Sequence, residues 1–120
     1  MDTNDQFIRA EQLLSNAKEE MMHPEADLVP YSICQKCYYS IVNYLNVYLH
    51  NRGVRIEENT DVGDLLKLAA LYDKKFNEID RSFLKYPKET EDVWMNVDRA
   101  KDFIRLTERT REIIGVKKTT

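Results

Sequence analysis

The sequence predicts an all-α protein, an antiparallel up-and-down four-helix bundle in a single domain over residues 1–115, with a short basic tail at residues 116–120. Two observations predict this fold class. Apolar residues recur at steps of three and four along four long segments, whereas no segment shows the two-residue alternation of a half-buried strand. The 120 residues also include only three glycines and three prolines, which suits long helices with short connections.

The first predicted helix covers residues 3–22. Its apolar stripe follows the helical period and consists of Phe7, Ala10, Leu14, Ala17 and Met21. The helix is expected to end before Pro24, because a proline disfavours the helical conformation in the residue that precedes it.

The second predicted helix covers residues 30–52, and the rest of the chain is organised around it. Only Lys36 and Arg52 carry a full charge in this segment, and apolar or aromatic side chains occur nearly all round the helix. Such a helix is buried, so the other helices are expected to pack around it. Gly53 is expected to end it in the left-handed conformation that glycine adopts readily.

Two further helices are predicted after a polar loop at residues 54–60. The third covers residues 60–79 and the fourth covers residues 90–114. Residues 81–87, which end in a proline, are expected to turn the chain between them. Short connections between successive helices favour an antiparallel bundle.

Composition and charge argue against several broad classes of function. The net charge is −3 and charged residues make up 32% of the chain, which gives no support to a general affinity for nucleic acids or membranes. No apolar run approaches the length that crosses a bilayer, and the polar, acidic beginning of the chain is unlike a secretory signal. Both cysteines lie within one predicted helix, which fits a reducing compartment. We therefore expect a cytoplasmic protein that does not bind membranes.

The two cysteines, Cys34 and Cys37, form a CxxC pattern. A thioredoxin-like site would place this pattern after a strand, at a helix N-terminus, whereas here it lies inside an apolar helix. A structural zinc site needs about four ligands, and the two histidines, His23 and His50, stand alone at helix ends. We interpret the cysteines as core residues and expect neither a bound metal nor a cofactor.

Two basic clusters are candidates for binding an anion. The first lies before the last helix and consists of Arg81, Lys85, Tyr86 and Lys88. It is suited to a phosphate group or an RNA backbone. The second is a stripe on the last helix, at Lys101, Arg105 and Arg109. Acidic residues flank this stripe, so we interpret it as an ion-paired, solvent-exposed face.

The second predicted helix also carries five tyrosines. Aromatic side chains of this kind can belong to the core, to a dimer interface or to a surface on which a ligand stacks. Tyr39 and Asn43 lie one turn apart and away from the main apolar stripe. We therefore expect these two residues to contact a second copy of the chain or another partner.

Three stretches of the sequence resemble the HEPN family of small helical bundles. They are CQKCYYSIVNYLNVYLHNRG at residues 34–53, TDVGDLLKLA at residues 60–69 and KYPKET at residues 85–90. In this order they provide a central helix with an Arg-Gly stop, a leucine pair and a Tyr-Pro turn before the last helix. The resemblance implies an antiparallel bundle that forms a homodimer. Members of the family include RNA-cleaving toxins, partners of small nucleotidyltransferases and binding domains without catalysis.

The resemblance also bears on catalysis. HEPN ribonucleases carry an arginine that is followed about one turn later by a histidine, which serves as general acid or base. Arg81 is followed by serine, phenylalanine, leucine, lysine and tyrosine, without a histidine. We therefore expect a non-catalytic HEPN-like binding or regulatory module, a homodimer whose partner is a nucleotidyltransferase-family protein, a nucleotide or RNA. Two alternatives stay open: a metal-independent ribonuclease with a degenerate site at Arg81, Lys85 and Tyr86, and a purely structural bundle without a pocket.

Overall fold

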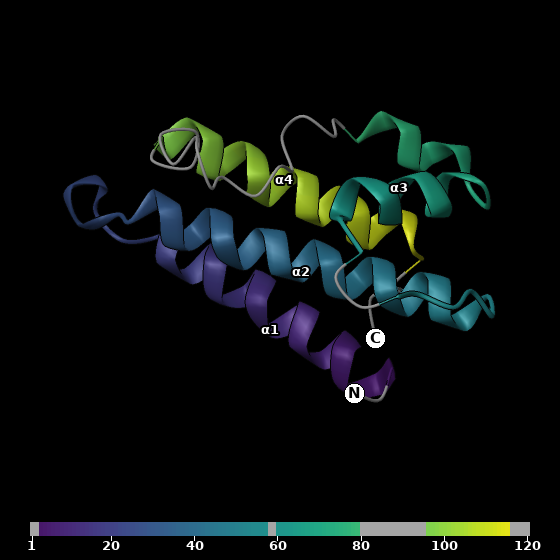
Figure 1. The fold of residues 1–120 in the computed structure, drawn as a ribbon. Helices are drawn as coiled ribbons and strands as arrows, with labels where there is room; N and C mark the ends of the chain where they lie inside the picture. The colour runs from purple at the N-terminus through teal and green to yellow at the C-terminus, as the bar shows by residue number, and fades with distance from the viewer. Residues whose placement is uncertain (1–2, 58–59, 80–95, 116–120) are drawn as a thin grey trace.

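The structure is a computed structural model that describes residues 3–57, 60–79 and 96–115, and all regular secondary structure in these ranges is helical (Figure 1). The elements are α1 (Thr3–Met21), η1 (Glu25–Asp27), α2 (Pro30–Asn51), α3 (Val62–Ala70), η2 (Lys74–Glu78) and α4 (Val97–Ile113), where η denotes a short 3-10 helix. The prediction of an all-α protein is confirmed for the described part of the chain. The predicted turn at residues 81–87 and the predicted tail at residues 116–120 lie outside the described residues.

Helix α2 begins and ends within one residue of its predicted bounds. Pro30 occupies its first turn, where the missing N–H of proline costs no hydrogen bond. Gly53 follows the end of α2 with a φ of 75°. The N–H of Gly53 donates to the carbonyl of His50, and the N–H of Val54 donates to the carbonyl of Leu49, each at 3.0 Å. This left-handed cap satisfies carbonyl groups at the helix end, as the sequence predicts.

Helix α3 is much shorter than the helix predicted over residues 60–79. It starts as expected after Asp61, whose side chain caps it. It ends at Ala70, and Asp73 starts the separate helix η2 by accepting a hydrogen bond from the N–H of Lys75 at 2.9 Å. An aspartate that binds the nearby backbone in this way competes with helix continuation. The prediction of one continuous helix is therefore wrong.

Helices α1 and α2 form an antiparallel pair. In the first half of α1, the carbonyl of Ala10 accepts a hydrogen bond from the Ser40 Oγ at 2.8 Å. Near the end of α1, Glu20 Oε1 accepts a hydrogen bond from the Ser32 Oγ at 3.0 Å. Residues late in α1 therefore meet residues early in α2.

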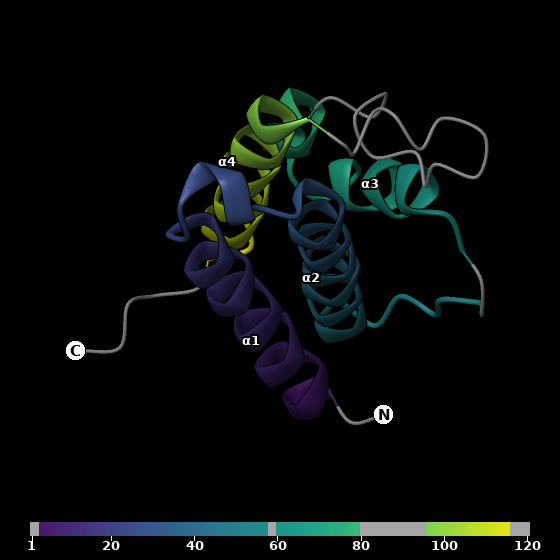
Figure 2. The same ribbon diagram turned by 90° about the vertical axis from the view of Figure 1, so that its left-hand side faces the viewer.

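Helix α4 also runs antiparallel to α1. The Arg111 Nε lies 2.6 Å from Glu11 Oε1, and the Lys18 Nζ lies 3.3 Å from Glu108 Oε2. Because α1 is antiparallel to both α2 and α4, the latter two helices are parallel to each other. Figures 1 and 2 show α2 in the middle, with α1, α3 and α4 around it.

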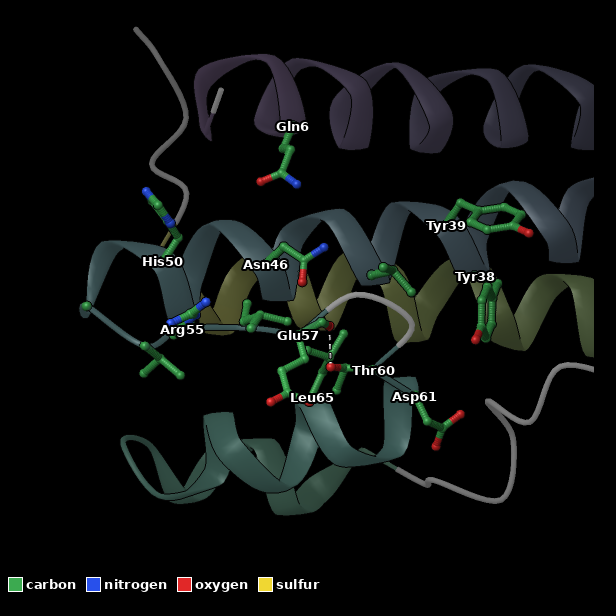
Figure 3. Close-up of a pocket in the computed structure, with 14 residues that line it drawn as sticks. Gln6, Tyr38, Tyr39, Asn46, His50, Arg55, Glu57, Thr60, Asp61 and Leu65 are labelled. Carbon is green, nitrogen blue, oxygen red and sulfur yellow. Dashed lines mark hydrogen bonds between the residues drawn. The ribbon is translucent and has the colours of Figure 1, made fainter. Parts of the chain in front are cut away.

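The direction of α3 differs from the predicted up-and-down alternation. Figure 3 shows Arg55 beside His50, at the end of α2, and Asp61 toward Tyr38, near the beginning of α2. The chain thus returns along α2 before α3 starts. The ring of Phe76, which lies beyond α3 in the chain, is 4.9 Å from the ring of Tyr48. Helix α3 therefore runs in the same general sense as α2, and the alternation of four antiparallel helices is not confirmed.

The core is built around α2, as its lack of charges predicts. Its fully buried side chains include Ile33, Ile41, Tyr44, Leu45 and Leu49. The surrounding helices bury apolar side chains against it, at Ala10, Ala17, Leu65, Leu66, Ala100 and Phe103. Two alanines of α1 have no exposed surface, which lets α1 approach α2 closely.

Candidate functional site

The basic cluster predicted to bind an anion lies outside the described residues. It consists of Arg81, Lys85, Tyr86 and Lys88. A role for this cluster in binding phosphate or RNA therefore stays a prediction, as does a degenerate ribonuclease site built on it.

Tyr39 and Asn43 lie on α2 as predicted. The side chain of Tyr39 is 40% exposed, and its ring meets the ring of Tyr38 edge to face at a centroid distance of 5.4 Å. The Nδ2 of Asn43 donates to the carbonyl of Tyr39 at 2.8 Å, so this amide serves its own helix. Their contact with a second copy or a partner stays a prediction.

The interpretation of both cysteines as core residues is confirmed. Cys34 and Cys37 have no exposed surface. Burial raises the pKa of each thiol to about 12, against the smaller opposing effects of Arg99 on Cys34 and of a hydrogen bond with Thr107 on Cys37. Thiols with so high a pKa are not nucleophilic near neutral pH.

The basic stripe on α4 is ion-paired at two of its three positions. The Arg105 Nη1 lies 3.3 Å from Asp102 Oδ1. Arg109 contacts Glu78 at 2.7 Å and Glu112 at 3.0 Å. These contacts confirm an ion-paired face at Arg105 and Arg109.

The described structure has a hollow of about 1100 Å³ beside α2, which we call the α2 groove. One wall is the α2 face that carries Tyr38, Tyr39, Val42, Asn46 and His50. Gln6 of α1 borders it on one side, and residues 54–57 with the start of α3 border it on the other (Figure 3).

The chain builds this groove because of how it leaves α2. The left-handed cap at Gly53 reverses the chain direction, and residues 54–57 then pass back along the helix. Val54 and Ile56 pack against the core, whereas Arg55 and Glu57 are exposed. This alternation of partly buried and exposed side chains is typical of an extended segment that packs one of its faces against the protein.

Asn46 is the residue in the groove that most requires an explanation. Its Oδ1 is buried and accepts no hydrogen bond from a described residue. Among the described residues, it is the only buried side-chain N or O atom without a hydrogen-bond partner. Figure 3 shows the Asn46 carboxamide between Gln6 and Glu57, inside the groove. A buried acceptor without a partner costs about 1–3 kcal/mol. A ligand toward which the Asn46 side chain turns would supply the missing hydrogen bond.

Charged side chains are divided between the two ends of the groove. His50 and Arg55 lie at the end where α2 stops, and Asp61 lies toward Tyr38, with Glu57 between them (Figure 3). Asp61 also caps α3, accepting a hydrogen bond from the N–H of Gly63 at 3.0 Å. The groove thus offers a guanidinium and an imidazole at one end and carboxylates farther along, with apolar and aromatic walls.

Sequence reasoning did not identify this groove. It treated residues 54–60 as a polar loop and attached no function to them. One signal was present, since Asn46 is a polar residue in the middle of a helix that is apolar nearly all round. The fold-back of the following segment over that residue could not be derived from periodicity.

Within the described ranges, no group of three or more His, Cys, Asp or Glu side chains is arranged to hold a metal ion. None of the helices described has the length and apolar character needed to span a membrane. Comparisons of the chain with protein-family models, with curated proteins and with solved structures found no match.

Proposed function

We propose that the protein is a non-catalytic, HEPN-like binding module that self-associates and binds its partner in the α2 groove. The partner classes are a nucleotidyltransferase-family protein, a nucleotide or RNA. The observation that supports a binding role is the unpartnered Oδ1 of Asn46, which lies in a groove large enough for a ligand. A buried acceptor without a partner requires an explanation, and a bound ligand that donates to it is one.

The residues around the groove support binding without catalysis. His23 follows the C-terminal end of α1 and His50 lies in the last turn of α2, and of the two only His50 borders the groove. No hydrogen bond from another described residue orients the His50 imidazole. General acid–base catalysis needs a side chain held within hydrogen-bond reach of the proton it moves.

The test uses the purified full chain and two asparagine variants. Asn46→Leu removes the unpartnered acceptor, and Asn16→Leu makes the same change at an exposed position of α1. Light scattering behind size exclusion, with absorbance at 260 nm, gives the solution mass and any bound nucleic acid. We expect a dimer for all three proteins.

Calorimetric titration with nucleotides, RNA oligonucleotides and peptides then tests the groove. We expect one class to bind to wild type and to Asn16→Leu, and to bind at least about tenfold more weakly to Asn46→Leu, because one buried hydrogen bond is lost. A strict monomer that binds none of these ligands would contradict the proposal.

A ribonuclease is a second candidate, and one observation favours it. His50 and Arg55 border the same end of the groove, and an imidazole and a guanidinium are the types of group that move a proton and hold a phosphate in this reaction. The test is cleavage of labelled RNA by wild type, His50→Ala and Arg55→Ala, with Arg9→Ala as an exposed control on α1. Loss of cleavage in the first two variants only would support it, and equal cleavage by all four proteins would remove it. The scaffold alternative predicts no pocket, and the groove argues against it.

A further inference from the structure

We infer that the ligand of the α2 groove is an extended peptide segment of a partner protein, which pairs edge to edge with residues 54–57. This inference rests on the proposed function and selects among its partner classes. Four observations carry it: the backbone of this segment, the acceptor of Asn46, the distribution of charge and the size of the hollow.

With respect to residues 3–57, 60–79 and 96–115, the backbone of residues 54–57 is an open edge. The N–H of Val54 donates to Leu49, and the carbonyl of Glu57 accepts from Thr60. In the described part of the chain, the N–H groups of Arg55, Ile56 and Glu57 find no acceptor. A strand-like segment with free N–H and C=O groups is a template on which another extended chain can add.

The acceptor of Asn46 lies across the groove from this edge. A peptide lying between the two would use one side of its backbone on residues 54–57 and offer an N–H on the other side to the Asn46 carboxamide, whose buried Oδ1 has to turn toward the hollow to accept it. Successive N–H groups of an extended chain point to opposite sides, so both requirements are met by one conformation. The unpartnered acceptor is thereby explained.

The charges around the groove favour a peptide over RNA. Arg55 provides one guanidinium, whereas Glu57 and Asp61 provide two carboxylates. A polyanion lying along the groove would meet both carboxylates, at a cost in electrostatic energy. A peptide can instead place an acidic side chain opposite Arg55 and a basic one opposite Glu57, two residues and about 6.6–6.8 Å farther along.

The size of the hollow agrees with an occupant of this kind. Its volume of about 1100 Å³ exceeds the roughly 300–1,000 Å³ of pockets that hold drug-sized molecules. Its apolar side chains, Val42, Val54, Ile56 and Leu65, come from both walls. They suit alternate apolar side chains of an extended chain.

The experiment is a selection of displayed random peptides of about seven residues on the full chain. We expect enriched peptides to contain β-branched residues with an acidic and a basic residue two positions apart. The second selection uses the charge-exchanged variant Arg55→Glu with Glu57→Arg, whose altered side chains are exposed and do not contribute to the core. We expect the order of the acidic and basic residues in the selected peptides to reverse.

The best peptide is then synthesised and titrated. Binding should weaken at least about tenfold in Asn46→Leu and after N-methylation of the peptide amide that reaches Asn46, since either change removes one buried hydrogen bond. The Asn16→Leu protein should bind like wild type. The inference would be overturned if the affinity of the selected peptide stayed the same after all of these changes.

Parallel titrations with ATP, GTP and a single-stranded RNA oligonucleotide separate this inference from the proposed function. If one of them binds and Asn46→Leu weakens it while no peptide is selected, the α2 groove is a binding site and the peptide is the wrong occupant. If nothing binds to wild type, the proposed function and the inference both fail.

Discussion

Asn46 shows how one side chain can oppose stability. Its Oδ1 is taken out of water by the fold and receives no hydrogen bond from any described residue in exchange. Leucine has a similar size and needs no partner, so the free protein is expected to prefer it at this position.

We therefore predict that Asn46→Leu raises the free energy of unfolding by about 1 kcal/mol, because the cost of desolvating the amide disappears. Urea denaturation followed by circular dichroism measures this difference. The matched change Asn16→Leu at an exposed site should stay within about 0.5 kcal/mol of wild type. A loss of stability in Asn46→Leu would mean that the amide is satisfied in solution.

Glu11 is a second residue whose environment has a measurable consequence. Its carboxylate accepts hydrogen bonds from the Arg111 Nε at 2.6 Å, from the Arg111 Nη2 at 3.2 Å and from the Tyr44 Oη at 2.5 Å. Burial acts to raise the pKa of Glu11, but the hydrogen bonds from Arg111 and Tyr44 and the charge of Arg111 outweigh it. The pKa of this carboxyl therefore lies below its ordinary value of 4.5.

A lowered carboxyl pKa makes stability depend on pH. The ionised form is favoured by folding, so its contribution is complete above the ordinary pKa of 4.5 and is lost as pH falls through the lower pKa of the folded state. We predict that Glu11→Gln is less stable than wild type by about 1–3 kcal/mol at neutral pH, and that this difference shrinks below pH 4.5. Urea denaturation from neutral to acidic pH measures both values. A difference that stays constant with pH would show that the charge of Glu11 is not what stabilises the contact.

At the scale of the elements, α4 depends on a single cap. The Oδ1 of Asn96 accepts hydrogen bonds from the N–H of Asp98 at 2.7 Å and of Arg99 at 3.4 Å. We predict that Asn96→Ala lowers the free energy of unfolding by about 1 kcal/mol, because these N–H groups lose their acceptor. Thermal unfolding should show a lower Tm. Asn96→Asp retains an acceptor and should keep most of the stability, so an equal loss in both variants would argue against capping.

The contact between α1 and α2 depends on small side chains. Ala10 has no exposed surface, and its carbonyl accepts the hydrogen bond from the buried Ser40 hydroxyl. We predict that Ala10→Leu destabilises the protein by about 1–3 kcal/mol, since the added atoms force the two helices apart. Ala26→Leu, at an exposed position of η1, is the control and should change the Tm little. Equal Tm values for the two variants would contradict close packing at Ala10.

The limits of sequence reasoning are clearest at α3. The apolar spacing within residues 60–79 includes Phe76 and Ile79, which are buried with exposed fractions of 0% and 2%, but it also includes Tyr72, which is 51% exposed. Phe76 nevertheless belongs to η2 and Ile79 lies directly after it, because Asp73 binds the backbone locally and ends the helical run. Apolar spacing reports burial, and it does not report a local competitor for backbone hydrogen bonds.

At the scale of the whole molecule, features that depend on a single helix were predictable from the sequence, whereas features that depend on contacts between segments were not. The burial of α2 and its left-handed end at Gly53 are set by local composition, and both are confirmed. The α2 groove depends on where residues 54–57 lie after that end. The pairing of Arg109 with Glu78, 31 positions apart in the chain, likewise requires the tertiary fold.

The common direction of α2, α3 and α4 gives the molecule an electrical asymmetry. Each helix places about half a positive elementary charge at its N-terminus and half a negative one at its C-terminus. The partial charges of α2, α3 and α4 add, and those of α1 oppose them. The sum is roughly one elementary charge of opposite sign at the two ends of the molecule. Side chains at the helix ends oppose this asymmetry, because α3 and α4 carry Asp64 and Asp98 in their first turns and Lys67 and Arg111 in their last turns.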